Sequence, residues 1–127
     1  MGLFGKKNNT DKNEGLKTPW ITLDNMSQLE TIVEKSKIRP QLIFKHSTRC
    51  GISRMVKKQF EAVYDIDENK ANLHYLDLLA NRDISNTIAS KFEVFHESPQ
   101  LLVVKNGVVV AHESHGSINN LDLKLFI

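Results

Sequence analysis

The 127-residue chain lacks the features that define several broad protein classes. It contains a single cysteine, so no disulfide can form within it, which excludes the disulfide frameworks of small secreted domains. No apolar run approaches the length of about 20 residues that a membrane span needs, and no signal-peptide pattern opens the sequence. We therefore expect one cytoplasmic domain, long enough to bury a core without disulfides or metals.

Clustered positive charge is also missing from most of the chain. The formal net charge is +2, and all of it comes from residues 1–18, where four lysines oppose two acidic residues. The remainder carries 13 basic and 13 acidic side chains, which disfavours nucleic-acid binding because phosphate neutralisation needs a basic folded surface. We predict a flexible basic tail over residues 1–18 and a folded domain over residues 19–127.

Apolar periodicity predicts alternating strands and helices. Strands are expected at 20–23, 41–46 and 73–78, and Asn106-Gly107 predicts a hairpin within 99–113. Helices are expected at 24–37, from Cys50 onward, at 83–92, and from a cap at Ser117 or Asn119 to the C-terminus. The apolar faces of the first three predicted helices consist of Met26, Leu29, Ile32 and Val33, then Ile52, Met55, Val56, Phe60 and Val63, then Ile84, Ile88, Ala89 and Phe92.

The order of these elements indicates an α/β fold. Strands separated by helices run parallel through right-handed crossovers, and the closing hairpin adds antiparallel strands. The predicted result is a thioredoxin-like fold, with a mixed central β-sheet flanked by helices and a C-terminal β-hairpin and helix. Another small α/β sandwich is the alternative, but few of those place a cysteine where a strand meets a helix.

Cys50 lies at that junction, in the stretch HSTRCGIS (46–53). A lone cysteine is commonly a buried apolar residue without chemistry. Here it falls at the predicted start of a helix, where unpaired backbone N–H groups and the helix dipole stabilise a thiolate. A thiolate is the nucleophilic form of cysteine, so Cys50 is our candidate catalytic residue.

The charge around Cys50 favours the same interpretation. From residue 35 to residue 60 there are eight basic residues and no acidic one, a pattern that by itself usually marks a solvated face. Near Cys50 this positive charge would stabilise the thiolate and attract an acidic small thiol. The basic residues are Lys35, Lys37, Arg39, Lys45, Arg49, Arg54, Lys57 and Lys58.

Ser53 occupies the position at which a C-x-x-C redox motif has its second thiol. Thiol–disulfide exchange needs a second thiol to resolve the mixed disulfide, so this chain requires one from outside. Ser53 either donates a hydrogen bond to the Cys50 thiolate or makes a local bond at the start of the helix. Pro99 begins a predicted strand, and thioredoxin-like folds place a cis-proline there, opposite the active-site cysteine.

These residues resemble the monothiol bacilliredoxins, the YtxJ-like branch of the thioredoxin superfamily. The resemblance covers residues 19–127 and is most specific in the T-x-C-x-I-S core around Cys50 and in the SPQLLVVKNG segment (98–107). It implies that Cys50 accepts bacillithiol from S-thiolated client proteins, and that Ser98 and Pro99 form the substrate-binding ledge. Bacillithiol, or another small thiol, would be a co-substrate, with no cofactor and no metal. The residues expected to stabilise the thiolate are Thr48, Arg49, Gly51 and Ser53.

Gly51 departs from the family pattern, which has proline after the cysteine. The resulting Cys-Gly-Ile-Ser is similar to the Cys-Gly-Phe-Ser of monothiol glutaredoxins, which hold an iron–sulfur cluster between two subunits. The glutathione-gripping Gly-Gly-x-Asp segment of that family has no match in AHESHGSI (111–118). An iron–sulfur cluster carrier is therefore the alternative function, followed by a non-catalytic thioredoxin-fold binding module. His96, His112 and His115 fit no strong metal-ligand spacing.

Overall fold

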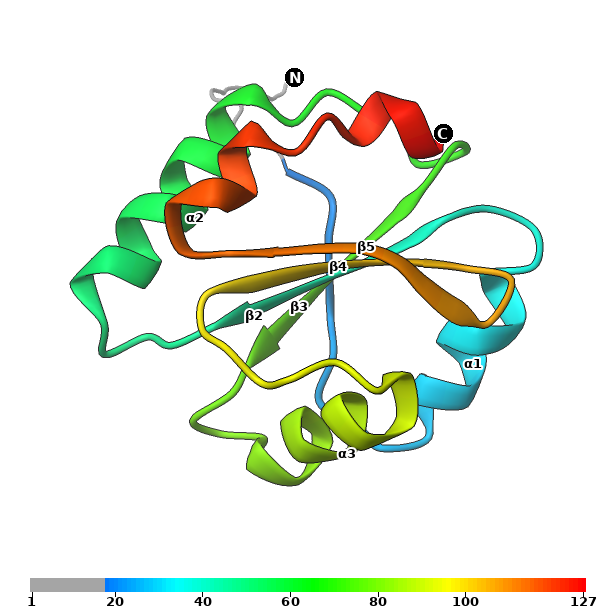
Figure 1. Cartoon of the computed structure of the whole chain (residues 1–127), viewed down its shortest axis with the longest axis horizontal. Coiled ribbons are helices and arrows are strands. Elements are labelled where there is room, and N and C mark those ends of the chain that lie inside the picture. The colour runs from blue at the N-terminus through cyan, green and yellow to red at the C-terminus, as the bar shows by residue number, and fades with distance from the viewer. Residues whose placement is uncertain (1–17) are drawn as a thin grey trace, which may run out of the picture.

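The computed structural model describes residues 18–127, so the predicted tail lies outside the described residues apart from Thr18. Strands and helices alternate in the predicted order (Figure 1). The elements are β1 (Trp20–Thr22), α1 (Gln28–Lys35), β2 (Gln41–His46), α2 (Gly51–Val63), β3 (Asn72–Asp77), α3 (Arg82–Phe92), β4 (Gln100–Lys105) and β5 (Val108–Ser114), followed by the 3₁₀-helices η1 (His115–Asn120) and η2 (Leu123–Phe126).

The five strands form one mixed sheet in the order β1-β3-β2-β4-β5. β3 pairs in parallel with both β1 and β2, whereas β4 runs antiparallel to β2 and β5 antiparallel to β4. The crossovers through α1 and α2 and the closing hairpin therefore produce the mixed sheet that the sequence predicted.

Helices cover both faces of the sheet (Figure 1). α1 and α3 pack on one face, against residues such as Ile43, Leu76 and Leu102. α2 and η1 pack on the other, against Leu42 and Phe44 among others. Alternate residues of β2 thus enter two different cores, which is why every residue of this central strand is buried, polar ones included.

The apolar face of α2 is narrower than its sequence predicted. Val56 and Phe60 are buried, together with Ser53. The other three predicted members of the face are exposed, by 58% for Ile52, 53% for Met55 and 71% for Val63. α2 lies on the sheet through a single stripe, and the apolar side chains beside that stripe face solvent. In the first helix the prediction fails only for Met26, which precedes α1 and is exposed.

The hairpin turn is formed as predicted by Asn106 and Gly107, which both have positive φ (52° and 81°). This geometry matches the right-handed twist of the flanking strands and suits an Asn-Gly pair. Ser36, at the end of α1, holds the turn in place, because its Oγ accepts from Gly107 N at 2.8 Å and its carbonyl accepts from Asn106 N at 2.9 Å.

The C-terminal helix is present as two short 3₁₀-helices rather than one continuous helix. Leu121 has an extended backbone between them, and Asp122 begins the second by accepting from Lys124 N at 3.2 Å. Ser117 and Asn119 lie inside η1 instead of capping a helix. Asn and Asp side chains compete for backbone hydrogen bonds and so favour such interruptions. Over residues 18–127, no helix combines the length and apolar character needed to cross a bilayer.

Candidate active site

Cys50 is the N-cap residue of α2. Its backbone is extended (φ −101°, ψ 122°), and its carbonyl accepts the first helical hydrogen bond, from Arg54 N at 3.1 Å. The side chain is partly exposed, and the first turn of α2 contains no acidic residue. The sulfur therefore sits at the positive end of a 13-residue helix whose dipole no carboxylate of the first turn offsets.

Ser53 is fully buried one turn further along α2. Its Oγ accepts from Ser47 N at 3.1 Å and lies 2.8 Å from His46 Nδ1. Among the described residues, the partners of this hydroxyl are thus at the end of β2, and the Cys50 sulfur is not one of them. Ser53 closes the loop that carries Cys50, and any effect on the thiolate acts through the position of that loop.

His46 ends β2 and is the buried partner of Ser53, so it is a strand-end histidine with its hydrogen bond satisfied beside the site, as the sequence suggested. Burial lowers the pKa of His46, and the nearby charge of Lys57 lowers it further, against the opposing effect of Asp77. The neutral imidazole is therefore favoured, and its Nδ1 can accept the Ser53 hydroxyl proton while Ser53 accepts from Ser47 N. This pair fills, with hydrogen bonds, the place where a second thiol would stand in a C-x-x-C protein.

Thr48, Arg49 and Gly51 are exposed around the cysteine. Arg54 Nη1 donates to the Thr48 carbonyl at 3.2 Å, which ties the loop to the first turn of the helix. A Cβ added to Gly51 would meet only the far end of the Arg54 side chain, at 3.9 Å. The backbone at Gly51 therefore leaves room for a Cβ atom. That Thr48, Arg49 and Gly51 stabilise the thiolate directly therefore remains a prediction.

The Ser98-Pro99 peptide bond is cis, as predicted. Lys45 of β2 pairs with Gln100 of β4 in antiparallel register, so Pro99 lies beside the end of β2 from which the Cys50 loop departs. Pro99 is buried, and its carbonyl accepts from His115 N at 2.9 Å. The predicted ledge and the predicted nucleophile thus lie at the same end of the sheet.

Lys45 differs most from its predicted environment, because it is fully buried rather than part of a basic surface. Its Nζ lies 3.3 Å from the Ser85 carbonyl and 3.3 Å from His96 Nδ1. Burial lowers the pKa of Lys45 to about 8. The signal that could have located it is strand alternation, since Lys45 shares a face with Ile43 in a strand covered by helices on both sides.

In the part of the chain from residue 18 onward, no group of three His, Cys, Asp or Glu side chains is arranged to hold a metal ion. His115 instead contacts Glu97, with Nδ1 and Oε1 3.7 Å apart. His96 faces Lys45 and Ser85.

Comparison with known proteins agrees with this geometry. The sequence model of the family described as monothiol bacilliredoxin BrxC matches residues 21–123. A solved structure described as a candidate oxidoreductase with a thioredoxin fold is similar at a TM-score of 0.67 and 35% identity, over 79% of this chain and 86% of that one.

Two more distant structures share the fold. The reduced thioredoxin pre-protein of Schistosoma mansoni has a TM-score of 0.65 at 23% identity, over 87% of this chain and 100% of that one. A thioredoxin from Malassezia sympodialis has a TM-score of 0.65 at 16% identity, over 81% and 84%. The thioredoxin-like fold is therefore confirmed, and the family match spans both Cys50 and Pro99. This chain belongs to the monothiol bacilliredoxin family, and its function is thiol redox chemistry.

Proposed function

We propose that this protein removes bacillithiol from mixed disulfides on client proteins by monothiol–disulfide exchange through Cys50. The observation that carries the proposal is the partly exposed Cys50 at the N-cap of α2, with a buried serine in place of a second thiol. Family membership supports this substrate class, and the place of Cys50 at the start of α2 supports its role as nucleophile.

The exchange is balanced without an added oxidant. The Cys50 thiolate attacks the bacillithiol sulfur of the client's mixed disulfide, and a new S–S bond forms between Cys50 and bacillithiol. The original S–S bond breaks, and the client cysteine leaves as a thiolate that takes a proton from water. Client cysteine is reduced, and Cys50 becomes the oxidised partner.

A second thiol must then attack the Cys50 adduct. Ser53 has no sulfur, and its hydroxyl is buried against His46. Resolution therefore requires an external small thiol or a partner reductase, which returns Cys50 to its reduced form and carries the bacillithiol away.

Substrate is held beside the sulfur by two features. The backbone at Ser98 precedes the cis-proline at the end of the sheet, where an extended client segment can pair with it as an added strand. Arg49 and Arg54 are exposed near the sulfur and provide positive charge for the carboxylates of an acidic small thiol.

Intact-mass spectrometry tests the proposal. The reduced protein is incubated with a bacillithiolated model client and, separately, with the same client glutathionylated. We expect the bacillithiol mass to move to wild-type protein and the client to be released in reduced form. Cys50→Ser should receive no mass, whereas Ser53→Ala, which keeps the thiol, should still receive it.

Other outcomes would overturn the proposal in distinct ways. Transfer of glutathione alone would point to a glutaredoxin-like protein, and colour on anaerobic purification would point to a cluster carrier. Transfer of neither thiol, with a Cys50 that alkylates slowly at neutral pH, would leave a binding module.

A further inference from the structure

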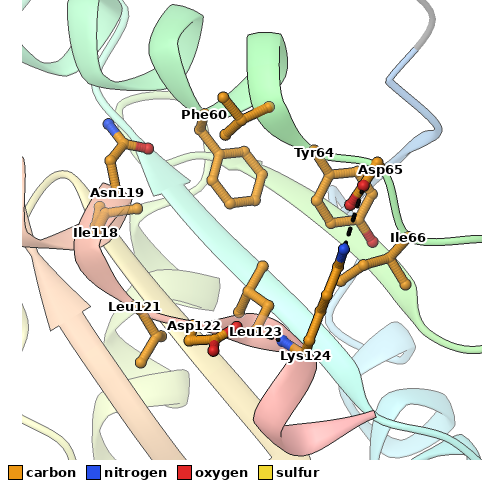
Figure 2. A pocket seen from close by; sticks show the side chains of 11 residues that line it. Phe60, Tyr64, Asp65, Ile66, Ile118, Asn119, Leu121, Asp122, Leu123 and Lys124 are labelled. Carbon is orange, nitrogen blue, oxygen red and sulfur yellow. Dashed lines mark hydrogen bonds and ion pairs between the residues drawn. The ribbon is translucent and has the colours of Figure 1, made fainter.

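A pocket of about 290 Å³ lies at the opposite end of α2 from Cys50 (Figure 2). Phe60 and Tyr64, at the end of α2, face residues of η1, η2 and the link between them. Its apolar lining includes Phe60, Ile66, Ile118, Leu121 and Leu123. The volume lies just below the range of about 300–1,000 Å³ typical of ligand pockets, so it suits a few apolar side chains.

Two polar atoms in this lining have no hydrogen-bond partner among residues 18–127. They are the Tyr64 hydroxyl and Asn119 Oδ1, both inaccessible to solvent. Burial also raises the pKa of Tyr64 to about 12, so its hydroxyl keeps its proton and can donate. Each of these groups costs about 1–3 kcal/mol while it stays unpaired, so the polar groups of this lining are incompletely satisfied.

The pocket and its surroundings are acidic. Asp65 and Asp122 line it, and Lys124 is the one basic residue that the described part of the chain contributes to the lining, with its Nζ 3.4 Å from an Asp65 oxygen. An adjoining hollow, which shares Tyr64, Asp65 and Ile66 with the pocket, adds Asp67 and Glu68. Together the two linings carry four carboxylates against one ammonium group, a formal charge of −3. An occupant with basic residues is favoured.

The described chain begins at the border of this pocket. Pro19 lines the adjoining hollow together with Tyr64, Asp65 and Ile66. In Figure 1 the blue start of the described chain likewise lies near the end of α2. The described chain therefore begins next to an apolar pocket with an acidic rim.

We propose that the N-terminal segment Met1–Lys7, MGLFGKK, docks in this pocket. Leu3 and Phe4 are the bulky apolar residues that would enter it, and Lys6 and Lys7 follow at once to meet the acidic rim. Phe4 is fourteen residues from Thr18, and a chain extends by up to about 3.3–3.6 Å per residue, so the segment can span far more than the width of the pocket. Because the segment is part of the same chain, its effective concentration is on the order of millimolar, and weak contacts suffice.

This docking site is separate from the thiol chemistry. α2 has 13 residues, which at 1.5 Å per residue makes it about 20 Å long, and the pocket and Cys50 are at its two ends. The inference thus goes beyond the proposed function, and either can fail without the other.

Paramagnetic relaxation enhancement in the full-length chain tests the docking. A nitroxide is attached through Gly2→Cys in a Cys50→Ser background, and amide signals of the ¹⁵N-labelled protein are compared before and after reduction of the label. We expect Ile118, Leu121 and Leu123 to lose most of their signal with the oxidised label, while Ile32 and Ile84, in the core on the other face of the sheet, keep theirs.

The matched control adds Leu3→Ser and Phe4→Ser to the labelled chain, which keeps its length and charge. The pocket signals should then recover, since the apolar anchors are gone. The proposal is overturned if the pocket signals survive in the first protein, or if they are lost equally in the control. It is also overturned if the loss occurs only between a spin-labelled copy and an isotope-labelled copy, which would make a second molecule the occupant.

Discussion

At the scale of single residues, the central strand β2 buries three polar side chains, and each of them contacts a different part of the fold. Gln41 contacts His74, Lys45 contacts Ser85 and His96, and His46 contacts Ser53. A buried polar group without a hydrogen-bond partner costs free energy, so a polar residue in a buried central strand needs a contact of this kind. The His46 contact is the one that reaches the Cys50 loop.

The buried His74 should make the free energy of unfolding depend on pH in the acid range. Burial lowers its pKa from 6.5 to about 4, Nε2 contacts Gln41 Oε1 at 2.8 Å, and the buried Nδ1 has no partner in the described part of the chain. Between these two pH values the unfolded chain binds a proton that the folded chain does not. The free energy of unfolding should therefore fall as pH drops from 6.5 to 4, by roughly 3 kcal/mol from this residue.

The substitution His74→Gln isolates that contribution, because glutamine can still donate to Gln41 but does not titrate. Urea unfolding followed by Trp20 fluorescence at pH 7 and at pH 4 measures it. The variant should lose less stability than wild type between these two pH values, while the exposed-site control His112→Gln should behave as wild type does. Equal losses in wild type and His74→Gln would show that His74 is not the titrating group.

At the scale of elements, short-range patterns predicted most of the fold. Apolar periodicity located α1, α2 and α3, and Asn106-Gly107 located the hairpin, because each signal depends on neighbouring residues only. The exposure of Ile52 and Met55 depends instead on what covers α2. Such tertiary contacts do not produce a periodic pattern of residues in the sequence.

The candidate site was predictable to a similar degree. Cys50 at a helix start and the cis bond before Pro99 followed from the order of the elements and from the resemblance to a known fold. The partners of Ser53 and Lys45 did not, because His46 and Ser85 meet them only after the loop has folded back and α3 has packed on the sheet.

Two glycines should respond to the same substitution in opposite ways. Gly51 is in the first turn of α2 with open space at its Cβ position, so Gly51→Ala should raise the free energy of unfolding by about 0.4–1 kcal/mol. Gly107 has φ of +81° in the hairpin turn, so Gly107→Ala should lower it by about 1–2 kcal/mol. Urea unfolding of both variants tests the two predicted changes in the free energy of unfolding. A destabilised Gly51→Ala would mean that Cys50 and its loop need glycine's conformational freedom.

At the scale of the whole molecule, the two sites to which we assign functions lie at the two ends of α2. The start of α2 presents Cys50, and the end of α2 forms the pocket proposed to receive the N-terminal segment. The sheet supports both ends, since Leu42 and Phe44 pack beneath α2 while the end of β2 leads into the Cys50 loop. Substitutions in the N-terminal segment should therefore change the pocket signals and leave thiol transfer unaltered.

The most direct test of the central claim is the number of turnovers without an external thiol. Reduced protein is mixed with excess bacillithiolated client, and the released client thiol is measured over time. We predict that wild type stops after a single turnover, with bacillithiol bound to Cys50, and that turnover resumes when a free small thiol is added. Continued turnover without that thiol, or no release at all, would contradict the account of Cys50 as a nucleophile that depends on an outside sulfur.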